Sequence, residues 1–274
     1  MSEPHSDIGP VLVHIDGVVA TVTLNSPEKL NALSTDVSLG LSDALATLHE
    51  DEHLRCIVIR GAGERAFSAG ADIAEFPRWR DNKARARIYA RILESGLDAI
   101  QSCRHPTIAL IEGLCVGGGF GVAAMCDLAI CSESSRFGVP VKRLGLVESP
   151  RELRPLVRKF GPRAMLEVLL PGELLNAQDA LRLGFVSRVV ADDITANVCY
   201  ELAGSIADGA PLVARWHKQF IYRLLDPEPL SPSEEDEGYD CYDTEDFHRG
   251  YQAFLAKEKA EFVGEVPCDI KGCD

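Results

Sequence analysis

The order in which strand-like and helix-like patterns follow one another constrains the fold of this chain more than any other feature. Val11 to Ile15 and Val18 to Leu24 alternate apolar with small or polar residues on either side of Asp16-Gly17, which predicts a β-hairpin. The segment from Ser34 to Glu50 has apolar residues at helical spacing, and Cys56 to Arg60 has the pattern of a short buried strand. Strands and helices that alternate in this way indicate an α/β protein.

The alternation continues and then gives way to helices. Two more apolar strands are predicted at Ile108 to Ile111 and Leu128 to Cys131, with a short helix between them from Gly119 to Met125. After Arg151 the predicted helices span residues 153–160, 164–169, 177–184, 194–207, 211–225 and 247–262. We therefore predict a core over residues 1–209 and a helical C-terminal segment over residues 210–274.

The charge of the chain argues against some partners. Lys and Arg together number 28 and Asp and Glu 42, which gives a net charge of −14. A nucleic-acid backbone or an anionic membrane surface would repel such a chain, so we expect neither as a partner. Ten of the acids lie between Leu224 and His248, where there is no Lys or Arg. Because their spacing does not fit a calcium loop, a solvated connection is the preferred interpretation.

Cysteine usage and the lack of targeting patterns predict a cytoplasmic protein. The nine cysteines include no CxxC pair and no Cys/His pattern of zinc spacing, so no metal site is expected. Free thiols inside apolar runs are typical of a reducing compartment. The first ten residues do not resemble a secretion signal, and the longest uncharged apolar stretch, Gly113 to Cys126, is shorter than the roughly 20 residues of a membrane span.

Two glycine-rich turns beside predicted strands are candidates for a binding site. The first covers residues 66–73, and the second covers residues 113–120 and leads into a helix. Small residues let a ligand approach the backbone, and the N–H groups at a helix start have no intrahelical partner. Either turn alone is also explained by tight packing. Gly61 to Ala66 fits a GxGxxA dinucleotide pattern, but a loop of small residues is expected after it instead of the helix that this pattern requires.

Seven short motifs, taken in order, resemble the enoyl-CoA hydratase/isomerase (crotonase) family. They cover nearly the whole chain, and residues 253–259 resemble the C-terminal helix of that family. Each motif alone is weak, but seven in order are specific to the superfamily. The motifs are Asn31-Ala32-Leu33, Ala66 to Ile73, Glu112-Gly113 with Gly117-Gly118-Gly119, Met125-Cys126-Asp127-Leu128, Phe137-Gly138, Asn176-Ala177 with Ala180, and Gly184-Phe185-Val186.

The resemblance implies a fold, an assembly and a ligand. The implied fold is a spiral of ββα units followed by a helical segment that packs trimers, often paired into hexamers. The implied ligand is an acyl-CoA thioester, so coenzyme A enters as part of the substrate and no separate cofactor is expected. The backbone N–H groups of Ala71 and Gly118 would hold the thioester carbonyl, and such donors stabilise a developing enolate more than they stabilise the ground state.

The sequence departs from the family at the acid–base positions. Hydratases of the family use two glutamates, and this chain has Gly121 and Val141 at the matching positions. A general base contributes about 10²- to 10⁴-fold in rate, so water addition needs a substitute. Glu148 is the candidate, because some relatives place a working carboxylate close to that position and apolar neighbours would raise its pKa.

A structural role for the same loop is equally compatible with the sequence. Glu148 would then cap or solvate the loop, and Glu152 would pair with Arg151 or Arg154. The helix that precedes the second glycine turn, together with residues 78–80, is expected to cover the acyl group.

Four residues are candidates for binding the coenzyme. Phe254 and Lys257 match positions where relatives contact the adenosine end of CoA, often across a subunit boundary, and a Lys charge suits a phosphate. Lys29 and Ala69 are further candidates, and Lys29 is equally explained as an exposed side chain. Phe254 is equally explained as a core residue of an amphipathic helix.

Three functions remain open at this point. The first is an enoyl-CoA hydratase, and the second is a different acyl-CoA reaction that uses Glu148, such as isomerisation, decarboxylation or thioester hydrolysis. The third is a non-catalytic protein that binds acyl-CoA. Similarity of fold alone does not choose between them.

Overall fold

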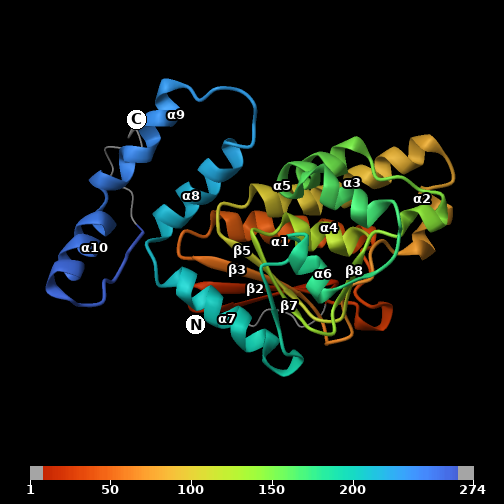
Figure 1. Cartoon of the computed structure of the whole chain (residues 1–274), viewed down its shortest axis with the longest axis horizontal. Helices are drawn as coiled ribbons and strands as arrows, with labels where there is room; N and C mark the ends of the chain where they lie inside the picture. Colours follow the sequence, from red (N-terminus) through yellow and green to blue (C-terminus); the bar gives the residue numbers. More distant parts are fainter. Residues whose placement is uncertain (1–8, 265–274) are drawn as a thin grey trace.

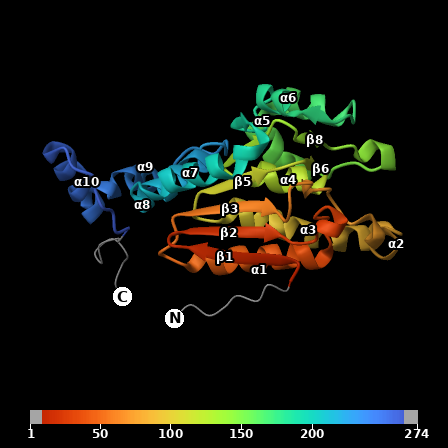
Figure 2. The same cartoon turned by 90° about the horizontal axis from the view of Figure 1, so that it is seen from below.

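The computed structural model describes residues 9–264 and contains two β-sheets. The larger sheet begins with the predicted hairpin and continues with parallel strands, so that its order is β1-β2-β3-β5-β7-β10. Figure 2 shows β1, β2 and β3 side by side. The strands of this sheet are β1 (Val11–Asp16), β2 (Val19–Leu24), β3 (Cys56–Gly61), β5 (Thr107–Ile111), β7 (Leu128–Ser132) and β10 (Arg188–Val190).

The smaller sheet is made of very short strands in the order β4-β6-β8-β9. Its first three strands are parallel and alternate along the chain with strands of the larger sheet. One of them corrects an expectation, because the first two residues of the loop predicted at Phe67 to Ala71 belong to β4. The strands are β4 (Ala66–Ser68), β6 (Leu114–Val116), β8 (Arg136–Gly138) and β9 (Leu175–Asn176).

Ten α-helices and five 3-10 segments lie within residues 9–264. The α-helices are α1 (Thr35–Glu50), α2 (Phe76–Trp79), α3 (Lys83–Ser102), α4 (Gly118–Met125), α5 (Pro150–Leu169), α6 (Ala177–Arg182), α7 (Thr195–Ala207), α8 (Pro211–Arg223), α9 (Pro232–Asp236) and α10 (Glu245–Ala256). The 3-10 segments are η1 (Pro27–Lys29), η2 (Ile73–Glu75), η3 (Val141–Leu144), η4 (Asp192–Ile194) and η5 (Glu237–Asp243).

A repeated ββα unit generates this architecture. Each unit gives one strand to the larger sheet and the next to the smaller sheet, and a helix then returns the chain: β3-β4 with α3, β5-β6 with α4, and β7-β8 with α5. Parallel neighbours need such crossovers. The predicted α/β spiral of ββα units is therefore confirmed.

Local sequence determines where the helices begin and end. Ser34 caps α1 by accepting a hydrogen bond from the Val37 N–H at 3.2 Å, as its position before the apolar pattern predicts. The break predicted between residues 160 and 164 is present, because Gly161 has φ 80° inside α5. The helix predicted over residues 247–262 ends earlier, at Ala256, because Lys257 adopts a left-handed conformation.

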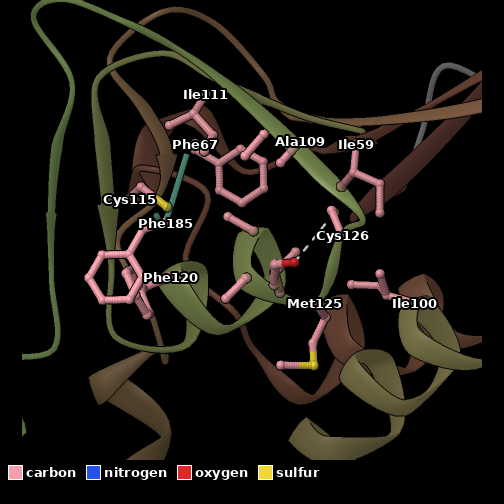
Figure 3. Packing of buried hydrophobic residues seen from close by; sticks show 14 of the residues in the cluster. Ile59, Phe67, Ile100, Ala109, Ile111, Cys115, Phe120, Met125, Cys126 and Phe185 are labelled. Atoms are coloured by element: carbon pink, nitrogen blue, oxygen red, sulfur yellow. Dashed lines mark hydrogen bonds between the residues drawn. The ribbon is translucent and has the colours of Figure 1, made fainter. Parts of the chain in front are cut away.

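The core lies on both faces of the larger sheet. Alternate residues of a strand point to opposite faces, so Ile57 and Ile59 pack in the cluster that includes α1, whereas Cys56 and Val58 pack against α7. Figure 3 shows the first cluster, where Phe120 and Phe185 meet edge to face with ring centroids 4.9 Å apart. Burial of both faces explains why these strands are continuous apolar runs.

The cysteines largely match their expected role. Among the described residues, six of them are buried free thiols and Cys241 is partly exposed, and burial raises the pKa of the Cys56 thiol to about 12. Cys268 and Cys273 lie outside the described residues. No helix within residues 9–264 combines the length and the apolar character that crossing a membrane would require.

Helices α8, α9 and α10 form the C-terminal part of the described chain, which we call the arm. Figures 1 and 2 both show α9 and α10 away from the two sheets, and α8 connects them to the part of the chain that contains the sheets. Most acids of the acidic run are exposed or partly exposed, which agrees with its interpretation as a solvated segment. The run is helical, however: it forms α9, η5 and the start of α10, where buried Asp246 accepts the N–H groups of Val263 and Gly264 at 2.7 and 3.0 Å. The predicted division at residue 209 falls between α7 and α8 and stays a prediction.

Candidate active site

The two glycine-rich turns meet because their strands are neighbours. β4 and β6 pair in parallel, with Ser68 opposite Cys115, so the turns that follow these strands leave the small sheet at the same edge. The first turn is held on its other side, where the Leu33 N–H donates to the Gly70 oxygen at 2.7 Å. The turns are therefore fixed by backbone pairing.

Glycine is required at the contact between the two turns. Gly70 has φ +89°, and a Cβ there would lie 2.9 Å from the Val116 oxygen and 3.2 Å from the Gly118 nitrogen. A Cβ on Gly119 would lie 2.6 Å from the Ser68 oxygen. Such distances leave no room for a side chain, so the glycines allow the two backbones to approach closely.

The same contact brings two backbone donors near each other. Gly118 is the first residue of α4, and the Ala71 nitrogen lies 3.8 Å from the position that a Cβ on Gly118 would occupy. Within residues 9–264, neither N–H donates to a protein acceptor. An unpaired N–H group at a helix start, with a second unpaired N–H group beside it, can bind an oxygen that carries negative charge.

Asn31, from the first of the seven motifs, has a structural role. Its side chain is buried and donates to the oxygens of Ala62 and Ala66 at 3.0 and 2.7 Å, and its own oxygen accepts the Ser26 N–H at 3.1 Å. These bonds tie the chain before α1 to the start of β4. Asn31 therefore supports the first glycine turn from behind.

A cavity of about 60 Å³ opens beside the second glycine turn. It lies between α3, α4 and α5, so a group bound at Gly118 would extend into it. Apolar side chains and carboxyl groups both line it. The lining includes Gly117, Gly118, Gly121, Leu97, Phe120, Met125, Val139, Leu153, Leu156, Met165 and Leu169, together with Glu94, Asp98, Glu148, Arg151 and Glu152.

Glu148 is a half-buried carboxyl on the wall of this cavity. Burial, followed by the nearby negative charge of Glu152, raises the pKa of Glu148 to about 7. The positive charge of Arg80 acts in the opposite direction and lowers this pKa. The raised pKa agrees with the expectation from the sequence, and it means that Glu148 exchanges protons easily near neutral pH.

The alternative pairing predicted for Glu152 is wrong. Glu152 forms a capping box at the start of α5: its carboxylate accepts the Ser149 N–H at 2.7 Å, and its own N–H donates to the Ser149 hydroxyl at 3.2 Å. Arg151 instead pairs with Glu94 and Asp98 of α3, at 3.1 and 2.7 Å. Ser149, not Glu148, is the residue that caps the helix.

Glu94 is the cavity residue that the sequence did not reveal. Its side chain is 8% exposed, and burial raises its pKa while the nearby Arg151 charge lowers it. The partner of Glu94 lies on another helix far along the chain, so no local pattern identifies this glutamate. α3 does cover the cavity as expected, but residues 78–80 do not line it.

The positions where the resemblance expects glutamates have different surroundings. Gly121 lines the cavity, and a Cβ there would be 3.7 Å from the Leu97 side chain, which is an ordinary contact. Val141 begins η3 and packs against the hydrophobic core. The carboxyl groups of the cavity therefore come from α3 and from the start of α5.

The structure separates the coenzyme-binding candidates into two places. Ala69 and Lys29 lie at the first glycine turn: the Ala69 N–H donates to the Leu30 oxygen, and Lys29 pairs with Asp72 at 2.9 Å, which raises the pKa of Lys29. Phe254 and Lys257 lie at the end of α10, in the arm. Phe254 is 82% exposed, so its alternative as a core residue of this chain is wrong.

Comparison with known proteins gives one family over nearly the whole length. Residues 14–265 match the model of the family described as enoyl-CoA hydratase/isomerase. The chain belongs to the enoyl-CoA hydratase/isomerase family. It is 34% identical to a probable enoyl-CoA hydratase of Rhizobium meliloti over 92% of this chain and 97% of that protein. It is 30% identical to the short-chain-enoyl-CoA hydratase of Clostridium acetobutylicum over 93% of this chain and 98% of that protein.

Solved structures of the family share the fold. An enoyl-CoA hydratase/carnithine racemase from Magnetospirillum magneticum superposes with a TM-score of 0.93 at 41% identity, covering 94% of this chain and 97% of that one. An enoyl-CoA hydratase from Bacillus anthracis superposes with a TM-score of 0.86 at 27% identity, covering 93% of this chain and all of that one (100%). The crotonase fold implied by the seven motifs is therefore confirmed.

Proposed function

We propose that this protein is an acyl-CoA enzyme that works through a thioester enolate and uses Glu148 to carry protons. The observation that supports the proposal is the cavity, because its lining includes both Glu148 and Gly118. Glu148 has a pKa of about 7, and the N–H groups of Gly118 and Ala71 are unpaired within residues 9–264. Membership in the enoyl-CoA hydratase/isomerase family supports the choice of ligand.

The chemistry follows from the two kinds of group. The N–H groups of Ala71 and Gly118 would accept the negative charge that develops on the thioester oxygen, and removal of one such donor typically costs about 2.7–4 kcal/mol. In hydration, water adds hydroxide at C3 of the enoyl group, and Glu148 delivers a proton to C2 of the enolate. The remaining proton of that water restores Glu148.

Double-bond migration is a second candidate, favoured by the pKa of about 7 of the Glu148 carboxyl group. Ionised Glu148 would take a proton from C2 of a 3-enoyl thioester, and the electron pair would form a dienolate. The same proton would return at C4 to give the 2-enoyl thioester. Both reactions transfer protons without oxidation or reduction, so we propose that no cofactor is needed beyond the CoA of the substrate.

Ultraviolet absorbance and mass spectrometry of enoyl-CoA thioesters test this proposal. Hydration removes the conjugated enone and adds the mass of water, whereas migration from a 3-enoyl thioester creates the enone at constant mass. We expect one of these changes with the intact protein and a loss of about 10²- to 10⁴-fold in kcat for Glu148→Gln. A matched control is Glu133→Gln, because Glu133 is exposed and lies outside the cavity.

Three outcomes contradict parts of the proposal. If CoA thioesters bind, as calorimetry would show, but none reacts, the protein is a non-catalytic binder. If a reaction occurs and Glu148→Gln leaves kcat unchanged, another group carries the proton. If CoA thioesters neither bind nor react, the choice of ligand is wrong.

We also propose that the arm joins copies of the chain into a trimer or a hexamer. Its helices expose several large apolar side chains, including Ile221, Leu224, Phe254 and Leu255, of which Phe254 and Leu255 are 82% and 75% exposed. In such an assembly Phe254 and Lys257 would reach the coenzyme of a neighbouring copy. Light scattering of the full chain checks the assembly, and a monomer at working concentrations would contradict it.

A further inference from the structure

A second cavity adjoins the cavity beside Gly118. Its volume is about 490 Å³, against about 60 Å³ for the first cavity, and it lies between α3, α4, α5 and the end of α8. The two cavities have four lining residues in common, from α3, α4 and α5: Asp98, Gln101, Met125 and Pro155. These four residues therefore form the boundary between a small cavity at the glycine turns and a wide cavity next to it.

Met125 is the buried member of this boundary. It is the last residue of α4 and is 5% exposed, whereas Asp98 and Gln101 are exposed and Pro155 is half-buried. Figure 3 shows the Met125 side chain pointing away from Phe67. An unbranched Met side chain fills irregular space between packed elements. Met125 therefore closes the inner part of the boundary, and the two α3 residues lie at its outer rim.

The backbone on both sides of Met125 is held by Lys159 of α5. The Lys159 ammonium group donates to the Ala124 oxygen at 2.9 Å and also to the Cys126 oxygen. A positive charge at this place is favourable, because the carbonyl groups at the end of a helix have no intrahelical partner. Since Met125 lies between the two carbonyl groups, this contact ties the end of α4 to α5 and keeps Met125 at the boundary.

The size of the first cavity suits only a short acyl group. An apolar protein cavity of about 150 Å³ binds benzene. A cavity of about 60 Å³ therefore holds a group smaller than benzene. An acyl chain that begins at Gly118 would meet Met125 after a few carbon atoms, because Met125 separates it from the second cavity.

We propose that Met125 is a specificity-determining residue that limits the acyl group to roughly four carbon atoms by closing the first cavity against the second. This inference rests on the proposed function, because it takes an acyl-CoA thioester as the ligand. The second cavity is not a good site for a hydrocarbon chain, since charged groups line it and burial against them gains little. The charged lining residues are Asp98, Arg154, Arg158, Lys159, Arg223 and Asp226.

Calorimetry with saturated CoA thioesters of increasing chain length tests the inference without any turnover. The unchanged protein should bind butyryl-CoA at least about tenfold more tightly than hexanoyl-CoA or octanoyl-CoA, since one methylene in a closed pocket changes discrimination by about 10- to 200-fold. In Met125→Ala the boundary is open, so this ratio should fall to about one. Met125→Leu nearly conserves the volume of the side chain and should keep the preference.

Two further variants separate the boundary from a general loosening of the core. Met165→Ala shortens a Met that lines only the first of the two cavities, so it should improve the binding of hexanoyl-CoA and still exclude octanoyl-CoA. Pro155→Ala reduces the other apolar group of the boundary and places a better helix former inside α5. It should therefore fold, and it should relax the length limit in the same direction even if Met125→Ala does not fold.

The inference is overturned if Met125→Ala or Pro155→Ala folds and keeps the preference for butyryl-CoA. It is also overturned if the unchanged protein binds all chain lengths equally, or if Met165→Ala admits octanoyl-CoA as well as Met125→Ala does. A length limit that depends on Met125, in a protein that turns over no enoyl thioester, would leave the inference in place and remove only the proposed reactions. Absence of binding by every thioester would remove the ligand and the inference together.

Discussion

The two sides of the cavity are built in different ways. On the side of α4, the groups that matter are backbone atoms at Ala71 and Gly118, fixed by strand pairing and by glycines without room for a side chain. On the other side they are the side chains of Glu94, Glu148 and Glu152, brought together by α3 and the start of α5. The first side tolerates little change in the backbone, whereas the second is adjustable one side chain at a time.

The largest structural effect is expected on the backbone side. Gly119→Ala places a Cβ 2.6 Å from Ser68 atoms, so the small sheet must shift, and the free energy of unfolding should fall by about 1–3 kcal/mol. Gly121→Ala is the matched control in the same helix. Its Cβ would lie 3.7 Å from the Leu97 side chain, an ordinary contact, and Ala in place of Gly stabilises a helix by roughly 0.5–1 kcal/mol, so this variant should not be destabilised. Urea denaturation of both variants checks this, and equal destabilisation would contradict it.

The pH dependence of the free energy of unfolding tests the carboxylate side of the cavity. The pKa of Glu148 is raised in the fold from 4.5 to about 7, so its contribution to stability is present below pH 4.5 and is lost as the pH rises through 7. Relative to Glu148→Gln, the protein should therefore lose on the order of 1–2 kcal/mol between pH 4.5 and pH 7.5. Parallel curves of unfolding free energy against pH for the two proteins would refute the raised pKa.

Loss of the ion pair between Arg151 and Glu94, on the same side of the cavity, should change the stability less. Arg151→Gln leaves the buried Glu94 carboxylate without its cation, but Arg151 is 64% exposed and its charge is screened. We expect a loss in the free energy of unfolding at neutral pH that is smaller than the effect of Glu148. Arg154→Gln, an exposed neighbour for which no ion pair is present within residues 9–264, should be neutral, and an equal loss in both variants would argue against the pair.

The smallest effect is expected in the arm, which belongs to neither side of the cavity. Lys257 has φ 59° at the end of α10, a conformation that glycine adopts without strain. Lys257→Gly should raise the free energy of unfolding by roughly 0.5 kcal/mol, since relief of strain exceeds the entropy cost of glycine. If Lys257 also contacts CoA, calorimetry should show weaker binding of CoA thioesters, and unchanged affinity would remove it from the coenzyme site.

The sequence predicts the backbone side well because its determinants are local. Strand patterns and glycines lie within a few residues of each other, so the turns around Ala71 and Gly118 are visible as motifs. Glu94 and Arg151 are 57 positions apart and meet only when α3 packs beside the start of α5, which single-sequence patterns do not encode. The pairing of Glu152 was mispredicted because a capping contact to Ser149 outweighs nearby arginines.

The sequence also predicts the structure of the arm incompletely, for another reason. The acidic run has few apolar residues, so composition favours a solvated connection, yet Ser231 and Thr244 cap two short helices in it. The early end of α10 depends on the left-handed conformation of Lys257, for which a lysine gives no signal. Capping contacts and backbone conformation therefore account for these misses.

Exchange of the α-protons of a saturated acyl-CoA with deuterated water tests the central claim most directly, because it needs only enolate stabilisation and a proton carrier. The account predicts that the protein incorporates deuterium at C2 of butyryl-CoA, detected by mass spectrometry, and that Glu148→Gln slows this exchange by at least about 10²-fold. Exchange no faster than in buffer, or equally fast with Glu148→Gln, would contradict it.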